Sequence, residues 1–252
     1  MTPDGVRYLA AATRPVAHPF HLRWLLPRLL GENVARWTWT TRVSVVACAP
    51  LLAWFTGSPW MAAAVFLPGL AFAWRHPVTV DAPGLALALL AACLWPYSPV
   101  AAMVVVLIGA CVRETVPVWV ACFAWSLWPL LALLAVVVRW GMRHGEDPCG
   151  YGHLLAHPVQ SSRQFHRGQW LNPLVMVAPW GPLLLGLGAL TPQLAVALAL
   201  GYGQLVVATD SVRLYQWAAP VLALACVAVV PPVWLPLFAV ALVFNPWKGD
   251  GL

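Results

Sequence analysis

The chain has 252 residues; 62% of them are hydrophobic, only 9% are charged, and 14 Lys and Arg stand against 8 Asp and Glu. An ordinary soluble domain carries roughly 25% charged residues, and a chain of this size buries only about 70–75% of the surface that it exposes when unfolded. With a mean hydropathy of +0.78, the composition argues against a water-soluble enzyme and against a disordered protein. It also argues against a nucleic-acid-binding domain, because the arginines are not gathered on one polar face. We therefore predict an all-α polytopic integral membrane protein, with residues 1–252 in a single domain.

The N-terminal residues 1–36 are polar to amphipathic. Within them, Phe20–Leu30 alternates leucines and aromatic residues with Arg23 and Arg28. This stretch is too short and too charged to cross a bilayer. A basic, Trp-containing helix of this kind typically lies in the membrane interface, so we predict an interfacial amphipathic helix here.

Eight or nine hydrophobic segments follow. They cover residues 39–57, 59–74, 82–97, 98–112, 115–138, 171–190, 193–208 and 214–244, the last divided at Pro231 and Pro232, with a polar loop over 139–170. The stretch Trp95–Pro99 predicts a tight turn between the third and fourth segments. Several are shorter than the ~20 residues of a full span. Because the chain also contains 24 prolines and 18 glycines, we predict a transmembrane helical bundle with some short or broken helices.

Few charged residues lie beside these hydrophobic segments, and each such charge needs a physical reason. Outside the polar loop and the two termini they include Arg75, Asp81, Arg113, Glu114, Asp210 and Arg213. Asp81 precedes Ala82 and Pro83, a pattern typical of a helix N-cap. Most of the other charges belong to short sequence patterns, which are described next.

Three such patterns occur in order along the chain: Asp4 followed by the stretch Pro19–Pro27, then Arg113-Glu114-Thr115, then Asp210-Ser211-Val212-Arg213. Together they resemble bacterial membrane glycosyltransferases of the GT-C type, which use polyprenyl-phosphate sugars as donors. That group has a loop aspartate followed by a P-[FY]-x-x-R-x-L-x-P stretch, a helix that opens with R-E-T, and a late helix headed by D-x-x-R.

The resemblance implies a function and a set of site residues. The chain would move a sugar from a polyprenyl-phosphate donor to a lipid, glycan or protein acceptor, with Asp4 as the catalytic base. Arg23, Arg113 and Arg213 would bind the phosphate leaving group, and Glu114 and Asp210 would orient these arginines or bind sugar hydroxyls. The resemblance also implies a place in the bacterial cytoplasmic membrane, with membrane lipids and the lipid-linked sugar as partners and no nucleic acid. Since both reactants must share a small volume, we expect Asp4, Arg23 and Glu114 to converge on one cavity.

Two other functions stay open at this point: a transporter or channel-like protein, and a non-catalytic membrane scaffold. His153 and His157, with His144 and His166 nearby, offer no HExxH pattern, and no carboxylate lies at helical spacing from the His153/His157 pair. We therefore interpret these histidines as structural or interfacial and predict no metal site among them. No cofactor beyond the lipid-linked donor is expected, and a requirement for a divalent metal ion stays open.

Overall fold

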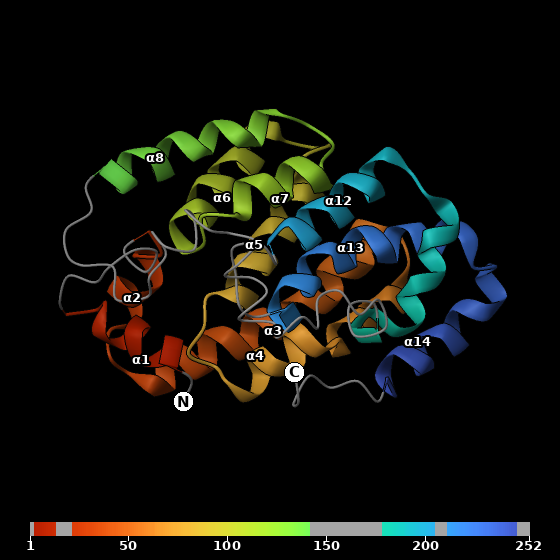
Figure 1. The fold of residues 1–252 in the computed structure, drawn as a ribbon, viewed down its shortest axis with the longest axis horizontal. Coiled ribbons are helices and arrows are strands. Elements are labelled where there is room, and N and C mark those ends of the chain that lie inside the picture. Colours follow the sequence, from red (N-terminus) through yellow and green to blue (C-terminus); the bar gives the residue numbers. More distant parts are fainter. Residues whose placement is uncertain (1–2, 14–21, 142–177, 205–210, 246–252) are drawn as a thin grey trace. The chain divides into compact units, whose positions relative to one another are not determined.

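The computed structural model describes residues 3–13, 22–141, 178–204 and 211–245, and every regular element in these residues is a helix (Figure 1). The prediction of an all-α fold is confirmed in the described residues. The chain divides into two compact units, each made of two stretches of sequence. The first comprises Met1–Leu51 and Ala73–Tyr151, and the second Leu52–Phe72 and Gly152–Leu252.

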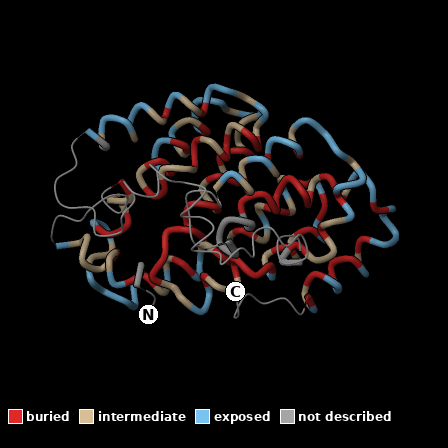
Figure 2. Tube along the Cα trace, in the orientation of Figure 1, coloured by how far each residue is buried: buried red, intermediate tan, exposed pale blue. Residues whose placement is uncertain are grey.

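The first unit holds most of the helices of the N-terminal half. They are α1 (Pro3–Ala10), α2 (Leu25–Leu30), α3 (Val34–Thr56), α4 (Pro68–Arg75), α5 (Asp81–Leu94), α6 (Pro99–Val112), α7 (Val116–Phe123), the 3₁₀ helix η2 (Trp128–Ala132) and α8 (Leu133–Gly141); α3 and α4 each have residues in both units. Helix α5 packs against α6 and α7, and most of its residues are buried (Figure 2).

A hydrophobic cluster joins the N-terminal segment to the rest of this unit. Tyr8 of α1 and Trp37 of α3 are both fully buried and have ring centroids 5.9 Å apart. Leu26, Val80 and Val112 belong to the same buried cluster. Burying side chains of this size contributes about 1.5–3 kcal/mol each, so the cluster fixes α1, α2 and the start of α5 against the end of α6.

The second unit is built from η1 (Pro59–Phe66), η4 (Ala178–Ala189), α12 (Pro192–Gly203), α13 (Ser211–Val229), η6 (Pro232–Trp234) and α14 (Leu235–Val243). Helix α13 packs most extensively against η4. The approach is close at Gly186, where a Cβ atom would lie 2.6 Å from the carbonyl oxygen of Leu222. Glycine is required there because any side chain would meet backbone.

Prolines set the starts of many helices. Pro99 and Pro192 are the first residues of α6 and α12, and the preceding Ser98 and Thr191 accept hydrogen bonds from the backbone N–H groups of Ala101 and Leu194. Proline at the first helical position loses nothing because its N–H would be unpaired there, and Ser or Thr caps the helix. The predicted breaks at Trp95–Pro99 and at Pro231–Pro232 are confirmed, since α5 ends at Leu94 and α13 at Val229.

No helix in the described ranges combines the length and the hydropathy that crossing a bilayer requires. This finding contradicts the prediction of a polytopic integral membrane protein in the bacterial cytoplasmic membrane. The longest helix in the described residues, α3, carries Arg36 and Arg42 among several threonines. The segment 115–138, predicted as one span, is divided into α7, η2 and α8, with Trp125 at a φ of 50° between α7 and η2.

The segment predicted as an interfacial helix differs from the expectation. Over the described part of this segment, residues 22–30, the structure has the six-residue helix α2. Leu26 is buried in the cluster with Tyr8 and Trp37, while Arg28 is exposed. The apolar side of this segment therefore packs on protein.

Candidate functional site

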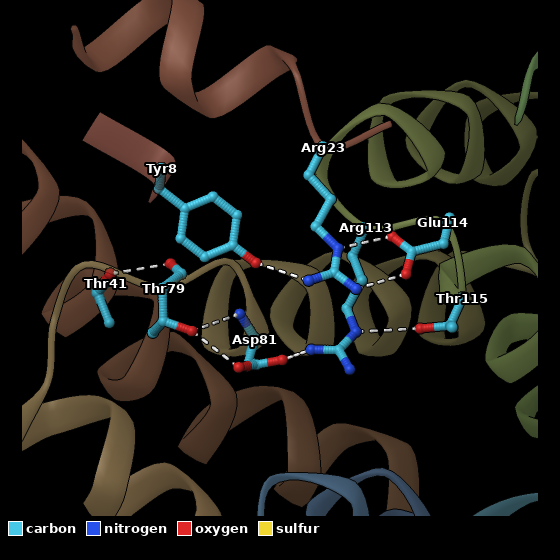
Figure 3. Close-up of polar contacts among 8 residues, drawn as sticks. All are labelled: Tyr8, Arg23, Thr41, Thr79, Asp81, Arg113, Glu114 and Thr115. Carbon is cyan, nitrogen blue, oxygen red and sulfur yellow. Dashed lines mark hydrogen bonds and ion pairs between the residues drawn. The ribbon is translucent and has the colours of Figure 1, made fainter. Parts of the chain in front are cut away.

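Four charged residues of the first unit gather where four parts of the chain meet: Arg23, Asp81, Arg113 and Glu114. These parts are α1, the residues just before α2, the start of α5, and the turn between α6 and α7 (Figure 3). The turn supplies two consecutive charges, Arg113 and Glu114. Figure 3 shows that the two side chains have different partners, so the site consists of two neighbouring ion pairs.

The outer pair joins Arg23 to Glu114, which are 91 residues apart in sequence. The Nε and Nη2 atoms of Arg23 donate to the two carboxylate oxygens of Glu114 at 2.8 and 2.6 Å. The Nη1 atom donates to the hydroxyl oxygen of Tyr8 at 2.7 Å. This is a bidentate pair of the strong, charge-assisted kind, and its side chains are 13% and 19% exposed.

The inner pair joins Arg113 to Asp81, the first residue of α5, and its side chains are 8% and 2% exposed. The Nε atom of Arg113 donates to the hydroxyl oxygen of Thr115 at 3.1 Å. The hydroxyl of Thr79 donates to the other carboxylate oxygen of Asp81 at 2.8 Å and accepts from the Asp81 N–H at 3.3 Å. Each charge of this pair is thus both neutralised and hydrogen-bonded, as a buried ion pair requires.

Backbone contacts hold the turn and the approach to α5 in place. The N–H of Arg113 donates to the carbonyl oxygen of Gly109 at 2.7 Å. A Cβ atom at Gly109 would lie 2.5 Å from a methyl carbon of the buried Val116, so glycine allows α6 and α7 to meet closely at this turn. Ahead of α5, the buried hydroxyl of Thr41 in α3 donates to the carbonyl oxygen of Pro77 at 2.5 Å.

The neighbouring charges shift the pKa values of Glu114 and Arg23. Burial alone would raise the pKa of Glu114, but the charge and hydrogen bonds of Arg23, with the charge of Arg113, lower it to about 2. Burial would likewise lower the pKa of Arg23, yet Glu114 and Tyr8 raise it well above its ordinary value. Both groups are therefore charged at neutral pH, and the two arginines and two carboxylates together carry no net charge.

The structure brings together some of the predicted site residues. Arg23 and Glu114 are in direct contact, and Arg113 lies in the neighbouring pair; that they line one cavity stays a prediction. Asp4 is in α1, one helical turn before Tyr8, but its side chain lies outside the described part of the structure, so its convergence on the pair stays a prediction.

The third pattern lies in the second unit. Asp210 falls outside the described residues, and Arg213 is described only as a backbone position in the first turn of α13.

Sequence reasoning missed Asp81, Tyr8, Thr79 and Thr115 as partners. Asp81 was interpreted as an N-cap; in the structure Val80 holds the cap position, and Asp81 pairs with Arg113. The sequence does carry a signal for an ion pair at Asp81, because an aspartate buried in an apolar stretch is costly unless a cation neutralises it. It does not specify which of several arginines is the partner.

Within the described ranges, no three His, Cys, Asp or Glu side chains gather as metal ligands would. The four histidines considered above, His144, His153, His157 and His166, lie outside those ranges.

Comparison with known proteins gives no relative: no family model, no curated protein and no solved structure matches this chain.

Proposed function

We propose that the Arg23–Glu114 cluster is the donor-phosphate end of a glycosyl-transfer site that uses a lipid-phosphate sugar. One observation carries the proposal. Arg23 and Glu114 come from two of the three patterns that resemble polyprenyl-phosphate-dependent glycosyltransferases, and they meet in a bidentate contact across 91 residues of sequence.

The chemistry of such a transfer suits these residues. The bond between the anomeric carbon and the phosphate oxygen breaks, and the phosphate leaves with the electron pair while the sugar becomes oxocarbenium-like. The planar fork of Arg23 suits two oxygens of that phosphate. Asp4 is proposed to take the proton of the attacking acceptor hydroxyl as a general base. Its position one turn before Tyr8, whose hydroxyl binds Arg23, supports an assignment to the same site.

The transfer assay uses the purified full-length chain and a panel of polyprenyl-phosphate sugars with radiolabelled sugar. Lipid, glycan and protein fractions serve as acceptors, and both label transfer and release of polyprenyl phosphate are measured. We expect Asp4→Asn to abolish transfer with no change in unfolding temperature. Arg23→Lys should retain a small part of the activity, because a point charge replaces a bidentate fork.

Arg28→Lys is the matched control, since Arg28 is exposed and five residues from Arg23. It should leave transfer unchanged. Full activity of Asp4→Asn, or equal losses in Arg23→Lys and Arg28→Lys, would refute the proposal.

A second candidate is a non-catalytic scaffold, and one observation favours it. Arg23 and Arg113 both engage carboxylates, so the cluster is electrically neutral and resembles a structural network. Under this alternative no donor in the panel releases polyprenyl phosphate, and Arg23→Lys lowers only the unfolding temperature.

A further inference from the structure

We infer that the Glu114 carboxylate occupies the place of a phosphoryl group at Arg23, and that the site binds a phosphate ligand by exchanging Glu114 out of the guanidinium fork. The inference rests on the proposed function for the kind of ligand, a lipid phosphate. The exchange itself needs only a phosphoryl group.

The contact geometry supports the exchange. Glu114 fills one edge of the guanidinium, the Nε and Nη2 atoms, with its two oxygens at 2.8 and 2.6 Å. Two oxygens of a phosphoryl group match that edge in the same bidentate way. The Nη1 atom is held separately by Tyr8, so Arg23 keeps one anchor when the other edge changes its partner.

The inner pair is built differently and does not offer the same exchange. Arg113 is held at Nε by Thr115 and at Nη1 by Asp81, and Thr79 holds the opposite oxygen of that carboxylate. The Asp81 side chain is only 2% exposed, whereas that of Glu114 is 19% exposed. An incoming anion therefore reaches the outer pair more readily, and Arg113 serves as an anchor for the turn.

Glu114 is then an internal competitor of the ligand. A phosphate brings a second negative charge to the position where the carboxylate lies, and like charges repel. The carboxylate must leave the fork before the phosphate binds. Substitution of Glu114 by glutamine keeps the size of the side chain but removes the charge, so it should strengthen phosphate binding.

The test measures the unfolding temperature and the heat of binding of the full-length chain at constant ionic strength. The probes are inorganic phosphate and farnesyl phosphate. We expect Glu114→Gln to bind phosphate at least roughly tenfold more tightly than the wild type, because the charged carboxylate no longer competes for the guanidinium. The double variant Arg23→Gln/Glu114→Gln should lose this gain.

Glu32→Gln is the matched control, because Glu32 is an exposed carboxylate that accepts from the Thr13 hydroxyl. Its phosphate response should equal that of the wild type. If Glu114→Gln does not fold, Glu114→Asp takes its place: the charge is kept but the reach is shorter, and a smaller gain over the wild type is expected.

An equal or weaker phosphate response of the folded Glu114 variant, or a gain that survives Arg23→Gln, would overturn the inference. A larger gain with farnesyl phosphate than with inorganic phosphate supports exchange by a lipid phosphate, and equal gains support exchange by the phosphoryl group alone. Because these measurements need no turnover, the expected gain without any sugar transfer would refute the proposed function and leave the exchange in place.

Discussion

Removal of one partner of the Arg113–Asp81 pair should destabilise the first unit strongly. The side chains are 8% and 2% exposed, so Asp81→Asn leaves a buried guanidinium without its counter-charge. Breaking a buried ion pair in this way typically costs about 3–5 kcal/mol of unfolding free energy. Arg113→Met leaves the carboxylate buried instead, and we expect a loss of similar size.

The double variant Asp81→Asn/Arg113→Met removes both charges together. Replacing a complete buried ion pair by uncharged side chains often changes the free energy of unfolding little. The double variant should therefore lose far less unfolding free energy than the two single variants lose in sum. We expect a coupling free energy of at least about 2 kcal/mol. The measurement is urea unfolding at pH 7 followed by tryptophan fluorescence, with the exposed Glu32→Gln as a control that should change stability by less than about 0.5 kcal/mol.

Two results would refute this reasoning: single losses below about 1 kcal/mol, or strict additivity in the double variant. If a single variant is unfolded in buffer, Thr79→Val gives a milder step. It removes one hydrogen bond to the Asp81 carboxylate, a loss of about 1.5–3 kcal/mol for a bond to a charged group. Thr79→Val should then have little effect in a chain that already lacks both charges.

Three further predictions concern other parts of the molecule. The pKa of Glu114 in the folded chain is about 2, against an ordinary 4.5, so its ion pair contributes up to about 3 kcal/mol to the free energy of unfolding above pH 4.5, and this contribution is lost as the pH falls toward 2. Urea unfolding should show this loss in the wild type relative to Glu114→Gln. Parallel pH profiles of the two proteins would contradict the prediction. In the same assay, Gly186→Ala should destabilise the second unit by about 1–3 kcal/mol. Gly203→Ala should be neutral or slightly stabilising, because a Cβ atom at residue 203 has no atom within 4 Å. Equal effects of the two substitutions would refute the close approach of Gly186 to Leu222. Arg213→Ala should abolish sugar transfer at normal abundance and unfolding temperature, and retained transfer would show that the late D-x-x-R pattern carries no chemistry.

The helix breaks could be read from the sequence because their causes are local. Prolines and turn residues at Trp95–Pro99 and Pro231–Pro232 act on their own backbone, and both breaks lie where they were expected. Hydropathy is a different kind of signal, since it reports composition and not the length of the helix that forms. The apolar segment 115–138 is long enough in sequence, yet the chain turns between Phe123 and Trp128.

The site could be predicted only in part for a related reason. The resemblance to a known pattern predicts that Arg23 and Glu114 belong to one cavity with Asp4; the structure shows the contact between Arg23 and Glu114, and the cavity stays a prediction. The Asp81–Arg113 pair depends on how α5 packs beside the α6–α7 turn, which local sequence does not specify. A lone aspartate in an apolar stretch predicts that a cation lies near it, but its choice of Arg113 is a property of the tertiary fold.

The consecutive placement of Arg113 and Glu114 links the two pairs mechanically. One turn directs the first side chain to Asp81 at the start of α5 and the second to Arg23 before α2. The inner pair and the backbone bond to Gly109 keep this turn fixed whether or not Glu114 is engaged. The deeper pair, which Thr79 and Thr115 also hold, thus supplies the rigidity, and the outer pair is left as the contact that a phosphate can exchange without loss of the surrounding fold.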